Sequence, residues 1–195
     1  MFQLKIDIAK NPRTLCRSLE QKFGMLPKQV KQAMQMAQEG TLEFMKRRFT
    51  ELSAEEYYIK PSVIRKSIRI QNYAKGARFS VSGERQPLHR YKLTPTRPGR
   101  KAVKLQGAVK RAGGLKPLGS AFLMRTKTGK YIAMRREGRN RLPVKALIGP
   151  AIPQIAVQYW DRDIKEAASE TFRQLMGSYI NKLYMLQSAG GEVSI

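Results

Sequence analysis

Residues 27–53, PKQVKQAMQMAQEGTLEFMKRRFTELS, carry a continuous apolar stripe at helical spacing. The stripe recurs at steps of three and four residues and consists of Val30, Met34, Ala37, Thr41, Met45, Phe49 and Leu52. Side chains at this spacing share one face of an α-helix, so the segment predicts a long amphipathic helix over 27–53. Gly40 inside it costs about 1 kcal/mol relative to alanine, which favours a bend or close packing at that point.

A second stripe lies near the C-terminus. It recurs at the same spacing and consists of Trp160, Ile164, Ala168, Phe172, Leu175, Tyr179, Leu183 and Leu186. This pattern predicts a second long helix over 161–186. We expect Asp161, Asp163 and Glu166 to lie in its first turns, where carboxylates stabilise the positive end of the helix dipole.

Before and between these helices the apolar period changes to two, which is typical of half-buried strands. The pattern predicts strands over residues 2–8, 68–72, 77–84, 121–125 and 130–135. The last two flank the turn TKTG, in which Gly129 suits a positive φ. Shorter helices are expected over 12–23, because Pro12 suits a first helical turn, and near Pro61.

These elements predict an α+β fold, in which a small antiparallel sheet packs with two long amphipathic helices. We expect a single domain over 1–187, followed by a flexible tail over 188–195. The segment 92–118 is broken by prolines and glycines and is strongly basic. We expect it to form an extended basic arm that is mobile unless a partner orders it.

The chain is strongly basic, with 38 Lys and Arg against 14 Asp and Glu and a net charge of +24. Most of this charge lies between Lys60 and Lys145, a stretch with 24 basic residues and only two acids, Glu84 and Glu137. A compact fold with such a block repels itself unless an anion or an acidic partner offsets the charge. A solvated surface is the simpler interpretation, but solubility needs a net charge of only about 2–8 on a small domain.

The sequence contains no pattern typical of an enzyme. Cys16 is the only cysteine and His89 the only histidine, which excludes an internal disulfide and leaves no metal-ligand spacing. We interpret Cys16 as a small buried thiol and His89 as a structural or surface histidine. No glycine-rich phosphate loop of fixed spacing precedes a helix. We therefore expect no catalysis, no cofactor, no metal and no small-molecule substrate.

Membrane association is not expected either. Residues 1–12 are interrupted by charges, so they do not form a signal peptide. No apolar run approaches the roughly 20 residues that cross a bilayer. We expect synthesis in a reducing cytoplasm.

The basic middle of the chain has the character of a nucleic-acid contact, because Lys and Arg neutralise phosphates and release counterions. Tyr91, Tyr131 and Phe122 lie among the cations and are candidates for stacking on bases, although sheet core is the simpler assignment. No helix-turn-helix, RNA-recognition or zinc-finger pattern is present, so no sequence-specific readout is expected. Charge alone leaves two partners open, a phosphate backbone and an acidic protein surface.

Residues 119–156 carry a more specific pattern. A small-residue strand with Ala-Phe is followed by a polar turn with glycine, an aromatic strand, a Gly-basic-Asn-Arg-x-Pro loop and a proline-containing stretch before the last helix. The positions are Gly119, Ala121, Phe122, Gly129, Tyr131, Arg135, Arg136, Gly138, Asn140, Arg141, Pro143, Pro150 and Pro153. This arrangement resembles the minor tail protein Z family of lambda-like tailed phages, and more loosely the tail-completion and neck proteins of related long-tailed phages.

The resemblance also covers the N-terminal helices and the strong basicity, although the first 60 residues match only a helix-rich pattern. It implies a virion structural protein that acts in tail completion at the head-proximal end of the tail, where the tail joins the head. Its partners would be other tail and neck subunits, further copies of itself in a ring, and phage DNA in the channel.

The resemblance implies one of two roles for the basic block, either contact with the phosphate backbone of the DNA end or docking onto acidic tail and neck subunits. In the first case the cations of residues 125–141 would all face the channel. The candidate contact residues are Arg97, Arg100, Lys101, Lys104, Arg125, Lys127, Lys130, Arg135, Arg136, Arg139 and Arg141. The alternative is a ribosomal or other non-catalytic RNA-binding protein, which the size, the charge and the Gly/Pro/Lys-rich segment also fit.

Overall fold

The computed structural model describes residues 2–8, 27–73, 76–99 and 104–188. Within them the fold is α+β, as the sequence predicts. The helix expected over 12–23 and the tail beyond residue 188 lie outside the described residues. The sequence predicts one domain, whereas the chain divides into two compact units, each built from separate stretches.

Unit 2 comprises residues 4–49, 68–81 and 157–195. It takes most of α2 (Pro27–Glu56) and all of η2 (Trp160–Ile164) and α5 (Lys165–Ser188). Its three-stranded sheet has the order β1-β3-β2. The strands are β1 (Phe2–Ile8), β2 (Ile68–Tyr73) and β3 (Gly76–Gly83), and β2 pairs antiparallel with β3.

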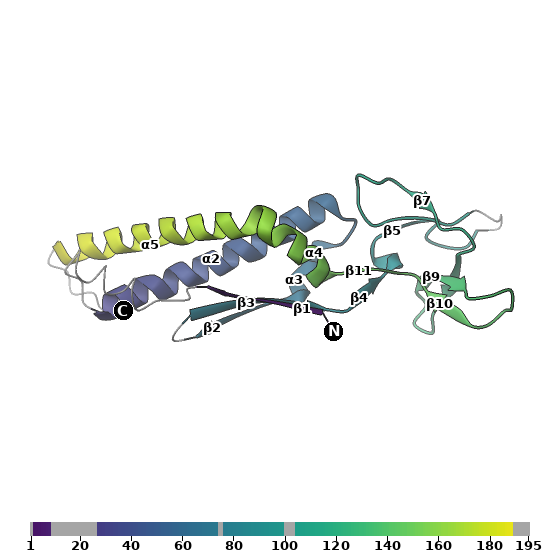
Figure 1. The fold of residues 1–195 in the computed structure, drawn as a ribbon, viewed down its shortest axis with the longest axis horizontal. Coiled ribbons are helices and arrows are strands. Elements are labelled where there is room, and N and C mark those ends of the chain that lie inside the picture. Colours follow the sequence, from purple (N-terminus) through teal and green to yellow (C-terminus); the bar gives the residue numbers. More distant parts are fainter. Residues whose placement is uncertain (1, 9–26, 74–75, 100–103, 189–195) are drawn as a thin grey trace. The chain divides into compact units, whose positions relative to one another are not determined.

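The core of unit 2 lies between the two long helices, which run side by side in Figure 1. The predicted stripe of α2 is buried from Val30 to Phe49, and its first part, from Val30 to Ala37, packs against α5. Buried core residues of the two helices are Val30, Ala33, Met34, Ala37, Met176, Ile180 and Leu183. A Cβ atom on Gly40 would lie 2.7 Å from Leu175 Cδ1, so the glycine serves close packing.

The C-terminal helical segment begins earlier than its stripe predicts. Helix α4 (Ile152–Tyr159) starts with Pro153 in its first turn, a position where proline loses no hydrogen bond. It is followed directly by the π-helical η2 and then by α5. Asp161 and Asp163 therefore lie in η2 and not at the start of a helix, and Asp163 forms an ion pair of 2.6 Å with Arg162.

Unit 1 comprises residues 1–3, 50–67 and 82–156. It holds the end of α2, then α3 (Pro61–Ser67) and three small sheets. The sheets are β11-β4, β5-β6-β7 and β10-β9-β8, and every strand pair in them is antiparallel. Their strands are β4 (Arg85–Pro87), β5 (Lys92–Thr94), β6 (Gln106–Ala108), β7 (Lys116–Pro117), β8 (Phe122–Arg125), β9 (Tyr131–Arg136), β10 (Val144–Ala146) and β11 (Ile148–Ala151).

The segment 92–118, expected as an extended basic arm, contains regular strands in its described residues. They form the sheet β5-β6-β7, and Leu93, Leu105 and Ala108 are buried. Backbone hydrogen bonds also tie this segment to the last residue of α2 and to the residues that follow the helix. The Tyr58 N–H donates to Val109 O at 2.9 Å, and the Arg111 N–H donates to Glu56 O at 2.8 Å.

The β8–β9 hairpin is confirmed, with Gly129 at φ +78° in its turn. The run does not stop at Pro143, however, because β10 adds a third strand that pairs Val144 with Arg136. The Leu147 N–H donates to Ala133 O at 2.8 Å, and the Leu88 N–H donates to Leu147 O at 2.9 Å. These bonds hold the hairpin sheet to the short 3-10 helix η1 (Leu88–Arg90).

Candidate polyanion-binding site

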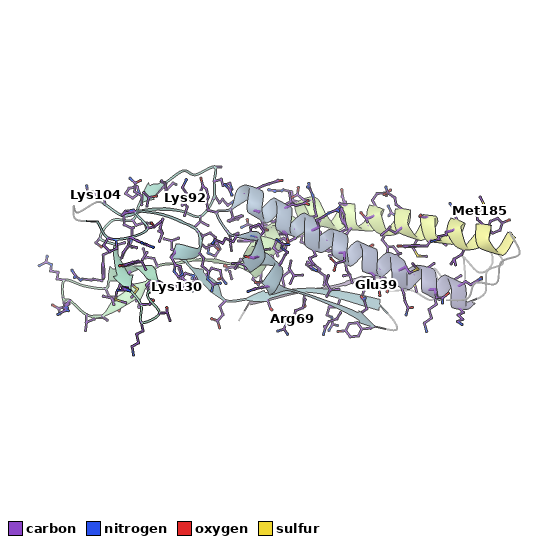
Figure 2. All side chains as sticks on the ribbon, turned by 180° about the vertical axis from the view of Figure 1, so that it is seen from behind. Glu39, Arg69, Lys92, Lys104, Lys130 and Met185 are labelled. Carbon is purple, nitrogen blue, oxygen red and sulfur yellow. The ribbon has the colours of Figure 1, made fainter. Side chains whose placement is uncertain are left out.

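The charge of the chain is concentrated in unit 1. Its residues include 21 Lys and Arg against five Asp and Glu, a net charge of +16. The basic block seen in the sequence is divided, because residues 68–81 belong to unit 2. Figure 2 draws the side chains, and Lys92, Lys104 and Lys130 mark unit 1 there.

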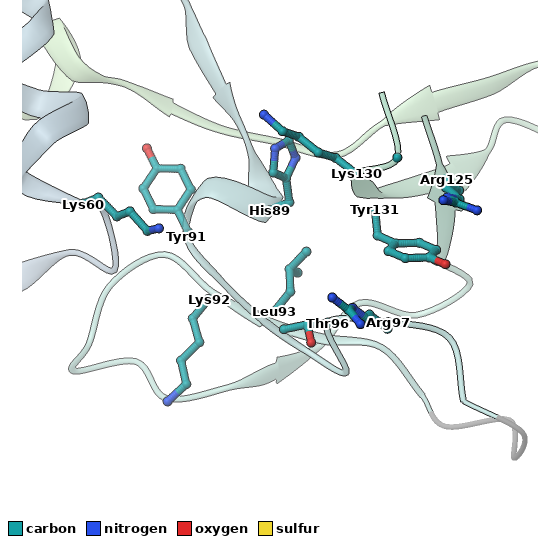
Figure 3. Close-up of a pocket in the computed structure, with 11 residues that line it drawn as sticks. Lys60, His89, Tyr91, Lys92, Leu93, Thr96, Arg97, Arg125, Lys130 and Tyr131 are labelled. Carbon is teal, nitrogen blue, oxygen red and sulfur yellow. The ribbon is translucent and has the colours of Figure 1, made fainter. Parts of the chain in front are cut away.

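A hollow of about 1110 Å³ lies within unit 1, and we name it the hairpin cleft (Figure 3). Its side chains come from the segment before α3, from η1 and β5 with the residue between them, from the turn after β5 and from the β8–β9 hairpin. The lining residues are Lys60, His89, Tyr91, Lys92, Leu93, Thr96, Arg97, Arg125, Gly129, Lys130 and Tyr131. Five of them are Lys or Arg, and none is Asp or Glu.

The hairpin turn places two of the cations and the tyrosine. Arg125 and Tyr131 are directly paired across β8 and β9, so their side chains share one face of the sheet. The Thr126 hydroxyl donates to Lys130 O at 2.9 Å and accepts from the Lys130 N–H at 3.1 Å. These bonds close the turn that carries Lys130, whose side chain extends toward His89 (Figure 3).

Tyr91 forms a rigid part of the cleft wall. Its hydroxyl donates to Pro150 O at 2.9 Å, and a Cβ atom on Gly149 would lie 2.6 Å from its ring. Only glycine at position 149 permits this approach. Burial raises the pKa of the Tyr91 hydroxyl far above its usual value, so the side chain is a neutral donor at all ordinary pH values.

His89 reports the electrostatics of the cleft. Burial, followed by the charges of Arg90 and Lys130, lowers the pKa of its imidazole. Lys130 lies beside the ring in Figure 3. The Nδ1 atom of His89 is buried and has no hydrogen-bond partner among the described residues. The imidazole is therefore neutral at pH 7 in a region of positive potential.

A second hollow of about 820 Å³, which we name the α3 cleft, borders the first. The two clefts share the lining residues Lys60, His89, Tyr91, Lys92 and Lys130. The α3 cleft adds the cations Lys66, Arg90 and Arg111, and again no Asp or Glu lines it. Two of its cations lie over the ring of Tyr58, Lys92 Nζ at 4.8 Å and Arg111 Cζ at 4.7 Å from the centroid.

The clefts contain only part of the predicted contact set. Arg97, Arg125 and Lys130 line the hairpin cleft. Six others are exposed elsewhere in unit 1 and line neither cleft, namely Lys104, Lys127, Arg135, Arg136, Arg139 and Arg141. Arg100 and Lys101 lie outside the described residues. Alternation along β9 sends Arg135 and Arg136 to opposite faces of the hairpin sheet.

Those two arginines have partners of their own. The Arg135 guanidinium donates through Nη2 to Leu118 O at 3.0 Å, and that of Arg136 lies over the Phe122 ring at 5.3 Å. Lys60, His89 and Lys92 line the cleft but are not among the residues predicted from the sequence. A signal is present in the run Leu88–Lys92, LHRYK, where the only histidine precedes Arg90 and a tyrosine stands between Arg90 and Lys92. Tyr91 and Tyr131 were noted, and Tyr91 proves buried as expected for core.

The arrangement is suited to binding a polyanion. Several donors from different elements converge on a hollow without a competing carboxylate, which is the condition for phosphate or carboxylate recognition. Among the described residues no group of His, Cys, Asp and Glu is placed to hold a metal ion. No helix in the described part of the chain is both long and apolar enough to cross a membrane.

Comparison with models of protein families, with curated proteins and with solved structures gave no match for this chain.

Proposed function

We propose that this protein is a structural, non-catalytic component of a tailed phage particle that contacts the phosphate backbone of DNA through unit 1. The proposal places it in tail completion at the head-proximal end of the tail, with tail and neck subunits and further copies of itself as neighbours. The position in the particle rests on the resemblance of residues 119–156 to the minor tail protein Z family.

The observation that carries the DNA contact is the hairpin cleft, in which five cations and no acid line one hollow. Bringing these cations together in the folded state is unfavourable without an anion, since each raises the electrostatic energy of the others. A phosphate backbone relieves the repulsion and releases its own counterions. The same contact needs no reading of base sequence.

The binding test compares two triple variants that remove equal charge. Arg97→Gln/Arg125→Gln/Lys130→Gln removes three cleft cations, and Arg136→Gln/Arg139→Gln/Arg141→Gln removes three exposed cations outside both clefts. Affinity for random-sequence DNA is measured by fluorescence anisotropy between about 50 and 200 mM salt, where a phosphate contact contributes about 0.9 to the slope of log affinity against log salt. We expect the magnitude of this slope to fall by about two to three for the cleft variant and by clearly less for the control variant.

Two outcomes contradict the DNA contact. Equal slope losses for both variants show that net charge acts without the cleft. Absence of binding at the lowest salt shows that the cations meet a different partner, for which acidic tail and neck subunits are then the candidates.

The position in the particle is tested by density-gradient fractionation of the lysate in which the protein is made. We expect the protein in the phage-particle fraction and, after disruption of particles, with the tails. Sedimentation with ribosomal subunits would contradict the proposal in favour of the RNA-binding alternative.

A further inference from the structure

The two clefts adjoin each other along a shared wall. They share five lining residues, so Lys60, Lys92 and Lys130 stand between two adjoining hollows of about 1110 and 820 Å³. The smaller volume lies within the range of about 300–1,000 Å³ that is typical of small-molecule sites, and the larger lies just above it. A stacked duplex has its phosphates on the outside and its bases inside, so it meets such hollows only at their rims. One or two nucleotides of a single strand fit inside them.

The distribution of cations provides contacts for successive phosphates. Arg97 and Arg125 stand on the hairpin side, the three shared lysines in the middle, and Lys66, Arg90 and Arg111 on the α3 side. Lys92 and Arg111 are held over the Tyr58 ring, and Arg90 Nη1 donates to Gln86 Oε1 at 2.8 Å. Cations held in this way lose less conformational entropy when an anion binds.

Tyr131 adds an aromatic surface on the hairpin side. It lines the hairpin cleft, is half-buried and stands opposite Arg125 in the strand register. Tyr91, the other tyrosine of this cleft, is buried against Gly149 and bonded to Pro150, so it shapes the wall. A phosphate track beside a half-buried aromatic ring is the arrangement with which proteins bind single strands without reading sequence.

We propose that the joined clefts bind single-stranded DNA, with successive phosphates along the cations from Arg125 to Arg111 and one base stacked on Tyr131. The proposal rests on the proposed DNA contact and narrows its ligand. Hydrogen bonding to a base edge plays no part, so any sequence that stacks is accepted.

The test compares three labelled probes at one salt concentration by fluorescence anisotropy. The probes are an oligothymidylate, a random-sequence duplex of the same length and the matching oligouridylate, and inorganic polyphosphate serves as a competitor with charge but no bases. We expect the oligothymidylate to bind at least about tenfold more tightly than the duplex. The expected cost of Tyr131→Leu is roughly a 5- to 100-fold loss for the oligothymidylate, the range of one base–aromatic contact, with competition by polyphosphate unchanged.

The variants have matched controls. Tyr131→Phe keeps the ring and retains single-strand affinity, and Tyr184→Leu removes an exposed tyrosine of α5 in unit 2 without effect on binding. Arg125→Gln weakens all nucleic-acid probes, whereas Arg136→Gln, on the opposite face of the same sheet, weakens them less.

The outcomes separate this inference from the proposed function. Equal or tighter binding of the duplex overturns the single-strand site and leaves the backbone contact standing, as does a Tyr131→Leu variant with unchanged oligothymidylate affinity. Tighter binding of the oligouridylate overturns the assignment to DNA. No binding of any nucleic acid means that the DNA contact of the proposed function is itself wrong.

Discussion

The pKa of His89 shows how burial and neighbouring charges act on a single side chain. The sequence analysis assigns it a structural or surface role because it has no metal-binding partner, and nothing in its neighbours along the chain gives its burial. The fold places its imidazole in the wall between the two clefts, beside Arg90 and Lys130. Burial and both cations disfavour the protonated ring, so its pKa lies below 6.5 in the folded state.

The lowered pKa predicts that acid destabilises the protein through this residue. Below about pH 6.5 the imidazole of the unfolded chain takes up a proton that the folded ring accepts only at lower pH, so unfolding becomes more favourable as the pH falls. We expect the free energy of unfolding of the native protein to decrease between pH 7.5 and 5.5, and that of His89→Gln to decrease less. Urea titrations at both pH values measure the difference, and parallel changes in the two proteins would contradict the prediction.

The two long helices show which features of a secondary-structure element are determined by residues close together in the sequence. Both stripes are visible in the sequence because residues three and four apart share a helix face whatever the rest of the chain does. Gly40 was recognised as a site of bending or close packing, and the contact that decides between them, Leu175 Cδ1, lies 135 positions further along the chain. Periodicity predicts which face of a helix is buried, whereas the residues that pack against that face are determined by the tertiary fold.

Gly40 and Gly177 offer a matched comparison of packing between α2 and α5. Both are helical glycines, but a Cβ atom at position 40 meets Leu175 at 2.7 Å, whereas nothing lies within 4 Å of one at position 177. We expect Gly40→Leu to lower the free energy of unfolding by about 1–3 kcal/mol through overpacking. Gly177→Leu gains up to about 1 kcal/mol of helix propensity. Urea denaturation measures both, and equal effects would show that Leu175 moves aside without cost.

The short strands of unit 1 set the limit of prediction from sequence. The β8–β9 hairpin was recognised because its two strands and its glycine turn are adjacent in the chain. Strands β5, β6, β7 and β10 have two or three residues each, which is too short for an alternation of polar and apolar residues to be recognised. Their pairing comes from partners elsewhere in the fold, which a local pattern does not contain.

The candidate site, like the sheets of unit 1, could be predicted only in part from the sequence. Arg97, Arg125 and Lys130 follow from the charge of the basic block. Lys60 belongs to that block too, but no local feature places residue 60 beside residue 130. Arg135 and Arg136 both belong to the predicted contact set, but as neighbours in strand β9 they lie on opposite faces of the sheet.

The charge of unit 1 has a consequence for the stability of the whole protein. Unit 1 has a net charge of +16, so most of its cations have no acidic partner available within the unit. In its described ion pairs, such as Lys110 with Glu56 and Lys145 with Glu137, at least one of the two side chains is exposed. Exposed pairs contribute little, typically below about 1 kcal/mol. Repulsion between cations is therefore the larger electrostatic effect in this unit.

Screening of this repulsion predicts that salt stabilises the protein. The Debye length falls from about 30 Å at 0.01 M to about 8 Å at 0.15 M ionic strength. We expect the unfolding temperature to rise over this range, by about 2–4 °C for each kcal/mol of repulsion removed, and to rise further with polyphosphate at equal ionic strength. Thermal unfolding followed by circular dichroism measures it. A lower unfolding temperature in salt would mean that attractive pairs outweigh the repulsion.

The interleaving of the two units along the chain also has a consequence for synthesis on the ribosome. The apolar stripe of α2 is complete by Phe49, but Met176, Ile180 and Leu183, which cover part of it, are translated more than a hundred residues later. At translation rates of about 5–20 residues per second, the nascent stripe waits on the order of ten seconds for its partner. During that interval the nascent chain exposes a helix-length apolar surface to chaperones and to other nascent copies, and its burial is completed only when α5 leaves the exit tunnel.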